Sequence, residues 1–395
     1  MDFADLVAPL SPERFLSDYW GQRPVHLPAQ PGRARPGMVS WDRLNVLLRQ
    51  RAHWDAEHLI LVMNSRGVAA EHYIDAVAGF SGARALANPA KVEALLAMGA
   101  SMVGNEVQDA DPDVRAVTDM LGRRFAGRAW GNLYASFQGV QAFASHCDTH
   151  EVFAVHSEGE KRWRLYTNRA DNPTQTLEGP EAQAAIDAAK GPVTMDVVMR
   201  PGDVLYIPRG WFHDAIASAE ASLHLTLGVL PHTGDVLFGL MRAAATSDPL
   251  FRAYLPDARE RGGAPLAEHL EMLMARLAAL VATPAFRGDV AVEQARSVDP
   301  GYATALPKRP VLSFYARTDR PFSLVATPAG QVLRSAGDYP LAGLGEVADF
   351  MLGRPGFSSH EVAARFLHHD RADVVALIAA AERMGLVERY QPERG

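Results

Sequence analysis

Cysteine is nearly absent from this chain, because Cys147 is the only one among 395 residues. A single cysteine excludes an intrachain disulfide and a zinc site built from several thiolates. Proteins of oxidising compartments usually contain more cysteine, since disulfides form and persist there. We therefore expect this protein to work in a reducing cytoplasm.

Long apolar runs and an excess of basic residues are missing as well. No apolar run reaches the roughly 18 residues that a transmembrane helix requires. The first residues, MDFADLVAPLSPERFL, contain acidic side chains and no basic stretch followed by an apolar one, so we expect no secretory signal. The formal net charge is −7, which disfavours binding to nucleic acid through a basic surface. These absences predict a protein that neither crosses a membrane nor binds nucleic acid through its charge.

The order of patterns along the chain predicts an α+β protein. Before residue 128, expected helices such as DPDVRAVTDMLGRRFAG alternate with expected strands such as HLILVMNS. Between residues 128 and 230, short runs rich in Val, Tyr, Phe and Trp alternate with turn residues, which is typical of a β-sandwich or barrel. Pro201-Gly202-Asp203 predicts a tight turn between two of these strands.

After Pro231 the pattern becomes helical again. The stretch LAEHLEMLMARLAALVA predicts a helix with one leucine-rich face, formed by Leu266, Leu270, Leu273, Leu277 and Leu280. Residues 308–335 have the pattern of short strands. Residues 345–395 follow the order helix, helix, helix, strand, and this order resembles a winged-helix module.

The segment SHCDTHEVFAVHSEGEKRWRLY contains the first candidates for a metal site. His146 and Asp148 are two residues apart, so on a strand both side chains would point to the same face. One imidazole and one carboxylate are two of the three ligands in the facial triad that binds Fe(II) and leaves coordination positions open. We expect the third ligand to be a histidine from a later strand.

His213, in PGDVLYIPRGWFHDA, is the best candidate for that third ligand, because a turn and an apolar strand lead into it. His150, His156 and His224 compete with it. On a strand, His150 would lie roughly 13 Å from His146, which favours a place at the mouth of the pocket. His224 belongs to a following strand and is expected to line the pocket.

With these residues in view, segment 128–230 resembles the JmjC-type (cupin-4) 2-oxoglutarate oxygenases, and the whole chain resembles their ribosomal-oxygenase branch. The matching strings are HCD…EVF…EGEKRWRLY and PGDVLYIPRGWFH…SLHLTLG. The resemblance implies a double-stranded β-helix (jelly-roll) oxygenase domain with N-terminal helical elements at residues 1–232. It further implies an α-helical dimerisation region at 233–304 and a C-terminal winged-helix domain at 305–395.

The resemblance also assigns roles to single residues. Fe(II) would be bound by His146, Asp148 and His213, with no catalytic residue beyond this metal site. Lys161, which follows an expected turn at Glu158-Gly159, would pair with the distal carboxylate of 2-oxoglutarate, because a buried dianion needs a cation. Further contacts to this cosubstrate would come from Asn132, Tyr134 and Thr226, and His224 and His150 would line the pocket.

Two positions depart from the family pattern. His156 stands where relatives often carry glutamine, and Gly228 stands where some carry a small hydroxyl residue. Neither position is a metal ligand in the family. Both leave the identity of the substrate open.

The implied function is hydroxylation of a protein or peptide side chain with Fe(II), 2-oxoglutarate and O2, giving succinate and CO2. A ribosomal protein is the expected substrate, and a small ribosomally made peptide is the alternative. An alternative of another class is a non-catalytic cupin and winged-helix module for binding or regulation. The leucine-rich helix predicts a homodimer. Residues 345–395 contain eight acidic and six basic side chains, so we expect the tail to contact protein rather than nucleic acid.

Overall fold

Two long antiparallel strands form the centre of the first part of the chain. β8 (Glu151–Arg169) pairs with β11 (Trp211–Pro231), and β11 pairs on its other side with β7 (Gly127–Phe137). Near the end of β11, Leu223, Leu225, Leu227 and Val229 are buried on one face, and Ser222 and His224 are buried on the other. Successive side chains of a strand point to opposite faces, so this part of β11 is covered on both sides.

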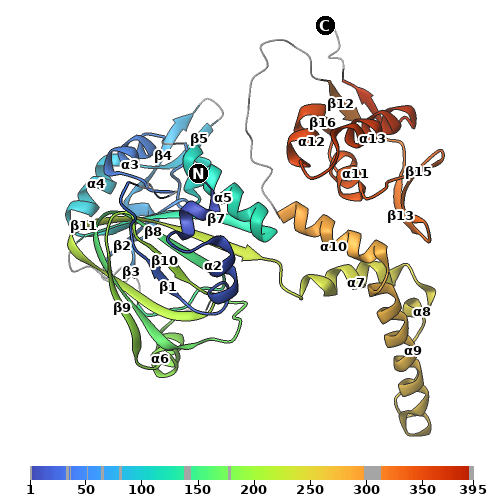
Figure 1. The fold of residues 1–395 in the computed structure, drawn as a ribbon, viewed down its shortest axis with the longest axis horizontal. Coiled ribbons are helices and arrows are strands. Elements are labelled where there is room, and N and C mark those ends of the chain that lie inside the picture. The colour runs from blue at the N-terminus through green and yellow to red at the C-terminus, as the bar shows by residue number, and fades with distance from the viewer. Residues whose placement is uncertain are drawn as a thin grey trace. The chain divides into compact units, whose positions relative to one another are not determined.

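The computed structural model describes residues 2–32, 35, 37–50, 52–63, 66–79, 82–137, 144–176, 179–297 and 313–390. By its internal contacts the chain divides into two units, Met1–Pro231 and His232–Gly395 (Figure 1). The three-domain division expected from the sequence stays a prediction. Its second boundary, after residue 304, lies outside the described residues.

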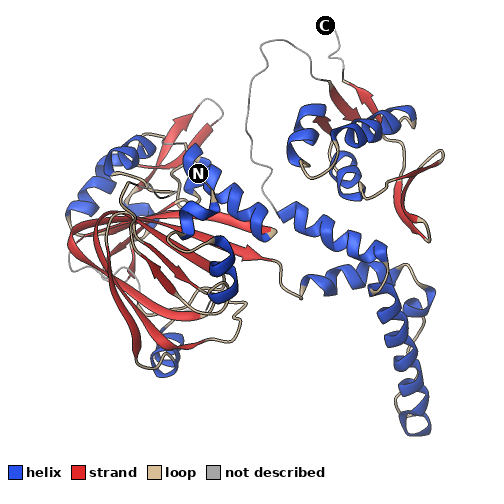
Figure 2. Ribbon diagram, in the orientation of Figure 1, coloured by secondary structure: helices blue, strands red, loops and turns tan. Residues whose placement is uncertain are grey.

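Within the described part of the first unit, the main sheet has nine strands. Their hydrogen-bonded order is β1 (Val25–Leu27), β10 (Val204–Ile207), β8, β11, β7, β6 (Ser101–Gly104), β2 (Leu59–Met63) and β3 (Arg66–Gly67), and β9 (Val193–Met199) pairs with β8. A separate hairpin joins β4 (Ile74–Gly79) to β5 (Gly82–Ala87). The strands of the main sheet curve around a common interior, as the expected jelly-roll core does (Figure 2).

Most helices of the first unit begin where the sequence supplies a side-chain cap. Ser11 accepts a hydrogen bond from the backbone N–H of Arg14 at the start of α2, and Asp111 caps α5 in the same way. Arginines occupy the last turn of α5, where they interact favourably with the helix dipole. The helix bounds are α1 (Phe3–Val7), α2 (Pro12–Asp18), α3 (Trp41–Leu48), α4 (Pro89–Ala97), α5 (Pro112–Phe125) and α6 (Pro180–Ala189).

The turn expected at Glu158-Gly159 is wrong, because β8 continues through these residues. The register of β8 against β11 shifts here, as it does at a β-bulge. Gly159 adopts a φ of +67°, and a Cβ at this position would lie 1.9 Å from the carbonyl oxygen of Ala221. The glycine therefore lets β8 change its twist without leaving the sheet.

In the second unit, helices come first and a small mixed region follows. The helices are α7 (Val236–Thr246), α8 (Pro249–Arg252), α9 (Ala264–Val281) and α10 (Pro284–Ser297). The leucine-rich stretch lies on α9, as predicted, and α9 buries none of its side chains against the described residues. No helix in the described ranges is long and apolar enough to cross a membrane.

The remainder of the second unit has its own core. One short sheet has the order β16 (Gly356–Ser358), β12 (Phe314–Arg317), β17 (Val387–Arg389), and another joins β13 (Ser323–Thr327), β14 (Gly330–Arg334) and β15 (Asp338–Pro340). The helices are α11 (Gly345–Leu352), α12 (Ser359–Arg365) and α13 (Arg371–Arg383). Val347, Met351, Phe357, Leu377 and Val387 are buried together. The winged-helix and dimerisation roles stay predictions.

Candidate functional site

The two candidate histidine ligands are joined through their backbones. His146 donates to the carbonyl of His213 at 3.0 Å, and His213 donates to the carbonyl of His146 at 2.8 Å. This pair is an isolated bridge, so the regular strand expected for HCD is wrong. Asp148 lies in irregular chain, where its carbonyl accepts a hydrogen bond from Gly210. Gly210, just before β11, and His213, near the start of β11, therefore hold the segment in place.

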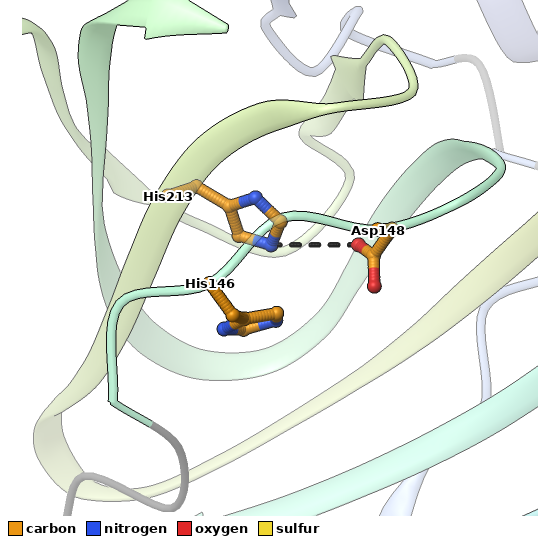
Figure 3. Close-up of side chains that lie close together, drawn as sticks. All are labelled: His146, Asp148 and His213. Atoms are coloured by element: carbon orange, nitrogen blue, oxygen red, sulfur yellow. Dashed lines mark ion pairs between the residues drawn. The ribbon is translucent and has the colours of Figure 1, made fainter. Parts of the chain in front are cut away.

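The three side chains still converge. Their ligand atoms all lie within 4.8 Å of one another, and His213 Nε2 is 3.6 Å from Asp148 Oδ2. Figure 3 shows the two imidazoles and the carboxylate facing a common space. Two histidines and one carboxylate are the donor set of the facial triad.

Hydrogen bonds orient both imidazoles for ligation. His146 Nδ1 lies 2.9 Å from the carbonyl of Ala144, and His213 Nδ1 lies 2.9 Å from the carbonyl of Trp211. An Nδ1–H that donates to a carbonyl places the lone pair on Nε2, which is how metal-binding histidines are usually arranged.

The charge states of the site also suit a metal. Burial, together with the neighbouring His146, lowers the pKa of His213 to about 4, so its imidazole is neutral at pH 7. Burial acts to raise the pKa of Asp148, but the nearby histidines hold it below its ordinary value. Neutral imidazoles and an ionised carboxylate are the forms in which these groups bind metals.

The triad opens into a cavity of about 200 Å³. Every site residue expected from the sequence lines it, together with three apolar or aromatic side chains that were not expected. The lining is Asn132, Tyr134, His146, Asp148, His150, Val152, Lys161, Trp163, His213, Ala215, His224 and Thr226.

Lys161 projects into this cavity from β8 and is 4% exposed. Its Nζ donates to Ser136 Oγ at 3.2 Å, and among the described residues it has no ion-pair partner. Burial lowers the pKa of Lys161 to about 7. A buried ammonium without an anion is poorly stabilised, so the site fits a ligand that brings a carboxylate.

The other polar lining residues belong to two paired strands. Asn132 on β7 is opposite Thr226 on β11, and Tyr134 is opposite His224. The rings of Tyr134 and His224 stack at 4.9 Å. Burial and the charge of Asp148 raise the pKa of Tyr134 to about 12, so the hydroxyl keeps its proton and is able to donate.

The two departures from the family pattern have structural explanations. His156 is fully buried behind the cavity, with Nε2 3.0 Å from the carbonyl of Gly159, so it packs rather than binds. At Gly228 a Cβ would lie 2.5 Å from the indole of Trp130. The glycine leaves room for Trp130, whose ring is 4.7 Å from that of His150 at the edge of the cavity.

A buried carboxylate that sequence reasoning missed connects the two histidine segments. Asp214, directly after His213, accepts hydrogen bonds from Ser145 and Tyr166 and pairs with Arg164. Ser145 directly precedes the first histidine of the triad. The network therefore ties both ligand-bearing segments to β8.

Part of the chain is similar in sequence to known proteins. Residues 107–237 match the family model of the JmjC domain. Ribosomal oxygenase 1 of Danio rerio is 30% identical over 261 residues, which cover 64% of this chain and 46% of that protein. The bifunctional lysine-specific demethylase and histidyl-hydroxylase NO66 of Drosophila persimilis is 29% identical over 225 residues, which cover 57% of this chain and 31% of that protein. The chain thus spans less than half the length of these relatives.

Solved structures of YcfD, a ribosomal oxygenase from Escherichia coli, share the fold. One, in complex with cobalt and succinic acid, aligns with a TM-score of 0.53 at 17% identity and covers 97% of this chain and 99% of that one. Residues 107–237 are therefore similar to a JmjC domain, and the fold is shared with the YcfD structures. In sequence, the chain is similar to ribosomal oxygenases over less than half of their length.

Proposed function

We propose that this protein is an Fe(II)- and 2-oxoglutarate-dependent dioxygenase that hydroxylates a side chain of a protein or peptide, with a ribosomal protein as the leading substrate. One observation carries the proposal: a two-histidine, one-carboxylate cluster and a buried lysine without an anionic partner among the described residues line the same cavity. A YcfD structure in complex with cobalt and 2-oxoglutarate supports a metal ion and 2-oxoglutarate as the ligands here.

In this proposal the chain holds and orients two bound groups. Iron and 2-oxoglutarate would supply the oxidation of a C–H bond by O2, with succinate and CO2 as products. His146, Asp148 and His213 hold the metal at one end of the cavity. Lys161 neutralises the distal carboxylate of the cosubstrate.

The remaining lining residues position the cosubstrate and keep water out. Tyr134, protonated at neutral pH, donates a hydrogen bond, and Asn132 and Thr226 offer polar atoms on facing strands. Val152, Trp163 and Ala215 add apolar surface to the same cavity. A buried cavity from which water is excluded strengthens each electrostatic contact within it.

Succinate release tests the activity. Protein supplied with Fe(II), 2-oxoglutarate, O2 and a pool of ribosomal proteins should release succinate, and His146→Ala or Asp148→Ala should stop the release. Asp196→Asn is the matched control, since Asp196 pairs with Arg162 on the exposed side of the same sheet. Wild-type protein that binds iron but releases no succinate would contradict the proposal.

The substrate is tested by comparing the proteins of a host strain with and without this gene by mass spectrometry. A ribosomal protein should carry an added oxygen atom only where the gene is present. A shift found only in a small peptide would favour the alternative substrate class.

A further inference from the structure

A second cluster of metal-ligating side chains lies in the second unit. Glu346 stands in the first turn of α11, and His368 and His369 lie in the turn between α12 and α13. Both histidines place Nε2 2.6 Å from the same oxygen, Oε1 of Glu346. One ligand atom from each residue lies within 4.8 Å of the other two.

The convergence goes beyond an ordinary ion pair. One imidazole would be enough to pair with the carboxylate, yet two rings, 4.3 Å apart between their centroids, point their nitrogens at one place. The turn that carries them is anchored, because the N–H of His369 donates to the carbonyl of Phe366, a residue 2% exposed. The next residue, Asp370, is used as the cap of α13.

The donor set is that of an open zinc site. Two neutral imidazoles and one carboxylate bind Zn²⁺ with a fourth position left for water or a ligand. Around a tetrahedral zinc ion, the ligand atoms lie roughly 3.3 Å from one another. Small rotations of the side chains would widen the present 2.6 Å distances to that value. His368 is 62% exposed and gives a metal ion a path of entry. Glu346 also lines a cavity of about 370 Å³.

We propose that Glu346, His368 and His369 form a second metal site, which takes a divalent transition metal such as Zn²⁺. The site is separate from the triad, and it does not depend on the proposed oxygenase activity. The bound ion would connect the first turn of α11 to the turn before α13. Because it binds only the folded state, it would raise the free energy of unfolding of the second unit.

Metal stoichiometry tests this proposal. The full chain, with any affinity tag removed, is saturated with Zn²⁺ and weighed by native mass spectrometry. His368→Ala combined with His369→Ala should bind one ion fewer per chain than wild type, and Glu346→Gln should weaken that ion at least about tenfold. His360→Ala, an exposed histidine on α12, is the matched control and should bind as wild type does.

The readout is a difference of one ion between wild type and the double variant, whatever the triad binds. Far-ultraviolet circular dichroism checks that the variants fold. Equal stoichiometry in wild type and folded double variant overturns the proposal. If the double variant does not fold, the Glu346→Gln variant provides the test. A Zn²⁺ affinity equal to that of wild type in this variant overturns the proposal.

Discussion

At the scale of single residues, Lys161 lies in surroundings that disfavour its charged form. It is buried, and burial is what lowers its pKa to about 7, against an ordinary value of 10.5. In the unfolded chain the amine returns to the ordinary value. Between pH 7 and pH 10 the unfolded state therefore binds more protons than the folded state, so the free energy of unfolding should rise with pH.

Lys161→Met should remove this pH dependence. In protein without metal or cosubstrate, the free energy of unfolding of wild type should rise by up to roughly 1 kcal/mol per pH unit above pH 7 relative to the variant. Urea denaturation at pH 7, 8, 9 and 10 measures both. If the free energy of unfolding changed with pH in the same way in both proteins, Lys161 would have an ordinary pKa and the prediction would be wrong. Lys91→Met, which removes an exposed lysine, is the control and should follow wild type.

Asp214 gives a second prediction for a single residue. It accepts hydrogen bonds from Ser145 and Tyr166, so Asp214→Asn should loosen both histidine segments. We expect Mn²⁺, used as a redox-stable probe, to bind about 10- to 100-fold more weakly, as when other supports of metal ligands are removed. Asp196→Asn should bind Mn²⁺ normally. Calorimetric titration measures the affinities, and unchanged binding in a folded Asp214→Asn protein would contradict the prediction.

Residue-level prediction from the sequence succeeded where the chain is regular. On β8, Lys161 and Trp163 are buried, whereas Arg162 is exposed and Arg164 is partly exposed, because side chains alternate along a strand. The same rule failed at HCD, since a bridge from His146 to His213, 67 residues further on, replaces the regular strand there.

Ser136, the partner of Lys161, was missed although it continues the alternation of Asn132 and Tyr134 on β7. Asp214 was missed because its partners come together only in the folded sheet. Both omissions concern contacts between strands that are distant in the sequence.

At the scale of elements, Gly159 lies where the register between β8 and β11 shifts. Gly159→Ala would place a methyl group against the backbone of Ala221 at a positive φ. We expect the free energy of unfolding to fall by more than about 2 kcal/mol. Gly67→Ala, where no atom lies within 4 Å, should change it by less than about 0.5 kcal/mol. Urea denaturation measures both, and equal effects would mean that the bulge adapts to a side chain.

The elements themselves were predicted unevenly. Long elements such as α5 and α9 were predicted from the spacing of their residues. β16 and β17 are three residues each, too short to show a period. β16 went unpredicted for that reason, whereas β17 was placed by its position after α13.

At the scale of the whole molecule, α9 predicts self-association. Its apolar face includes Leu270, which is 46% exposed, and Met274, which is 63% exposed. Exposed apolar surface of this kind is typical of interaction sites. We expect a homodimer, and light scattering at micromolar concentration should give twice the chain mass. Leu270→Glu with Leu273→Glu should give a monomer, while Glu268→Gln should not. A wild-type monomer would refute this prediction.

The pairing of β1 with β10 and of His146 with His213 has a consequence for synthesis on the ribosome. The first strand, Val25–Leu27, cannot pair until β10, which begins at Val204, has been synthesised. The sheet is complete only when β11 has been synthesised as far as Pro231. Contacts this distant in sequence form slowly. The three proposed metal ligands therefore cannot come together until nearly the entire first unit has left the exit tunnel, so a metal bound by them would be loaded after this unit has been translated.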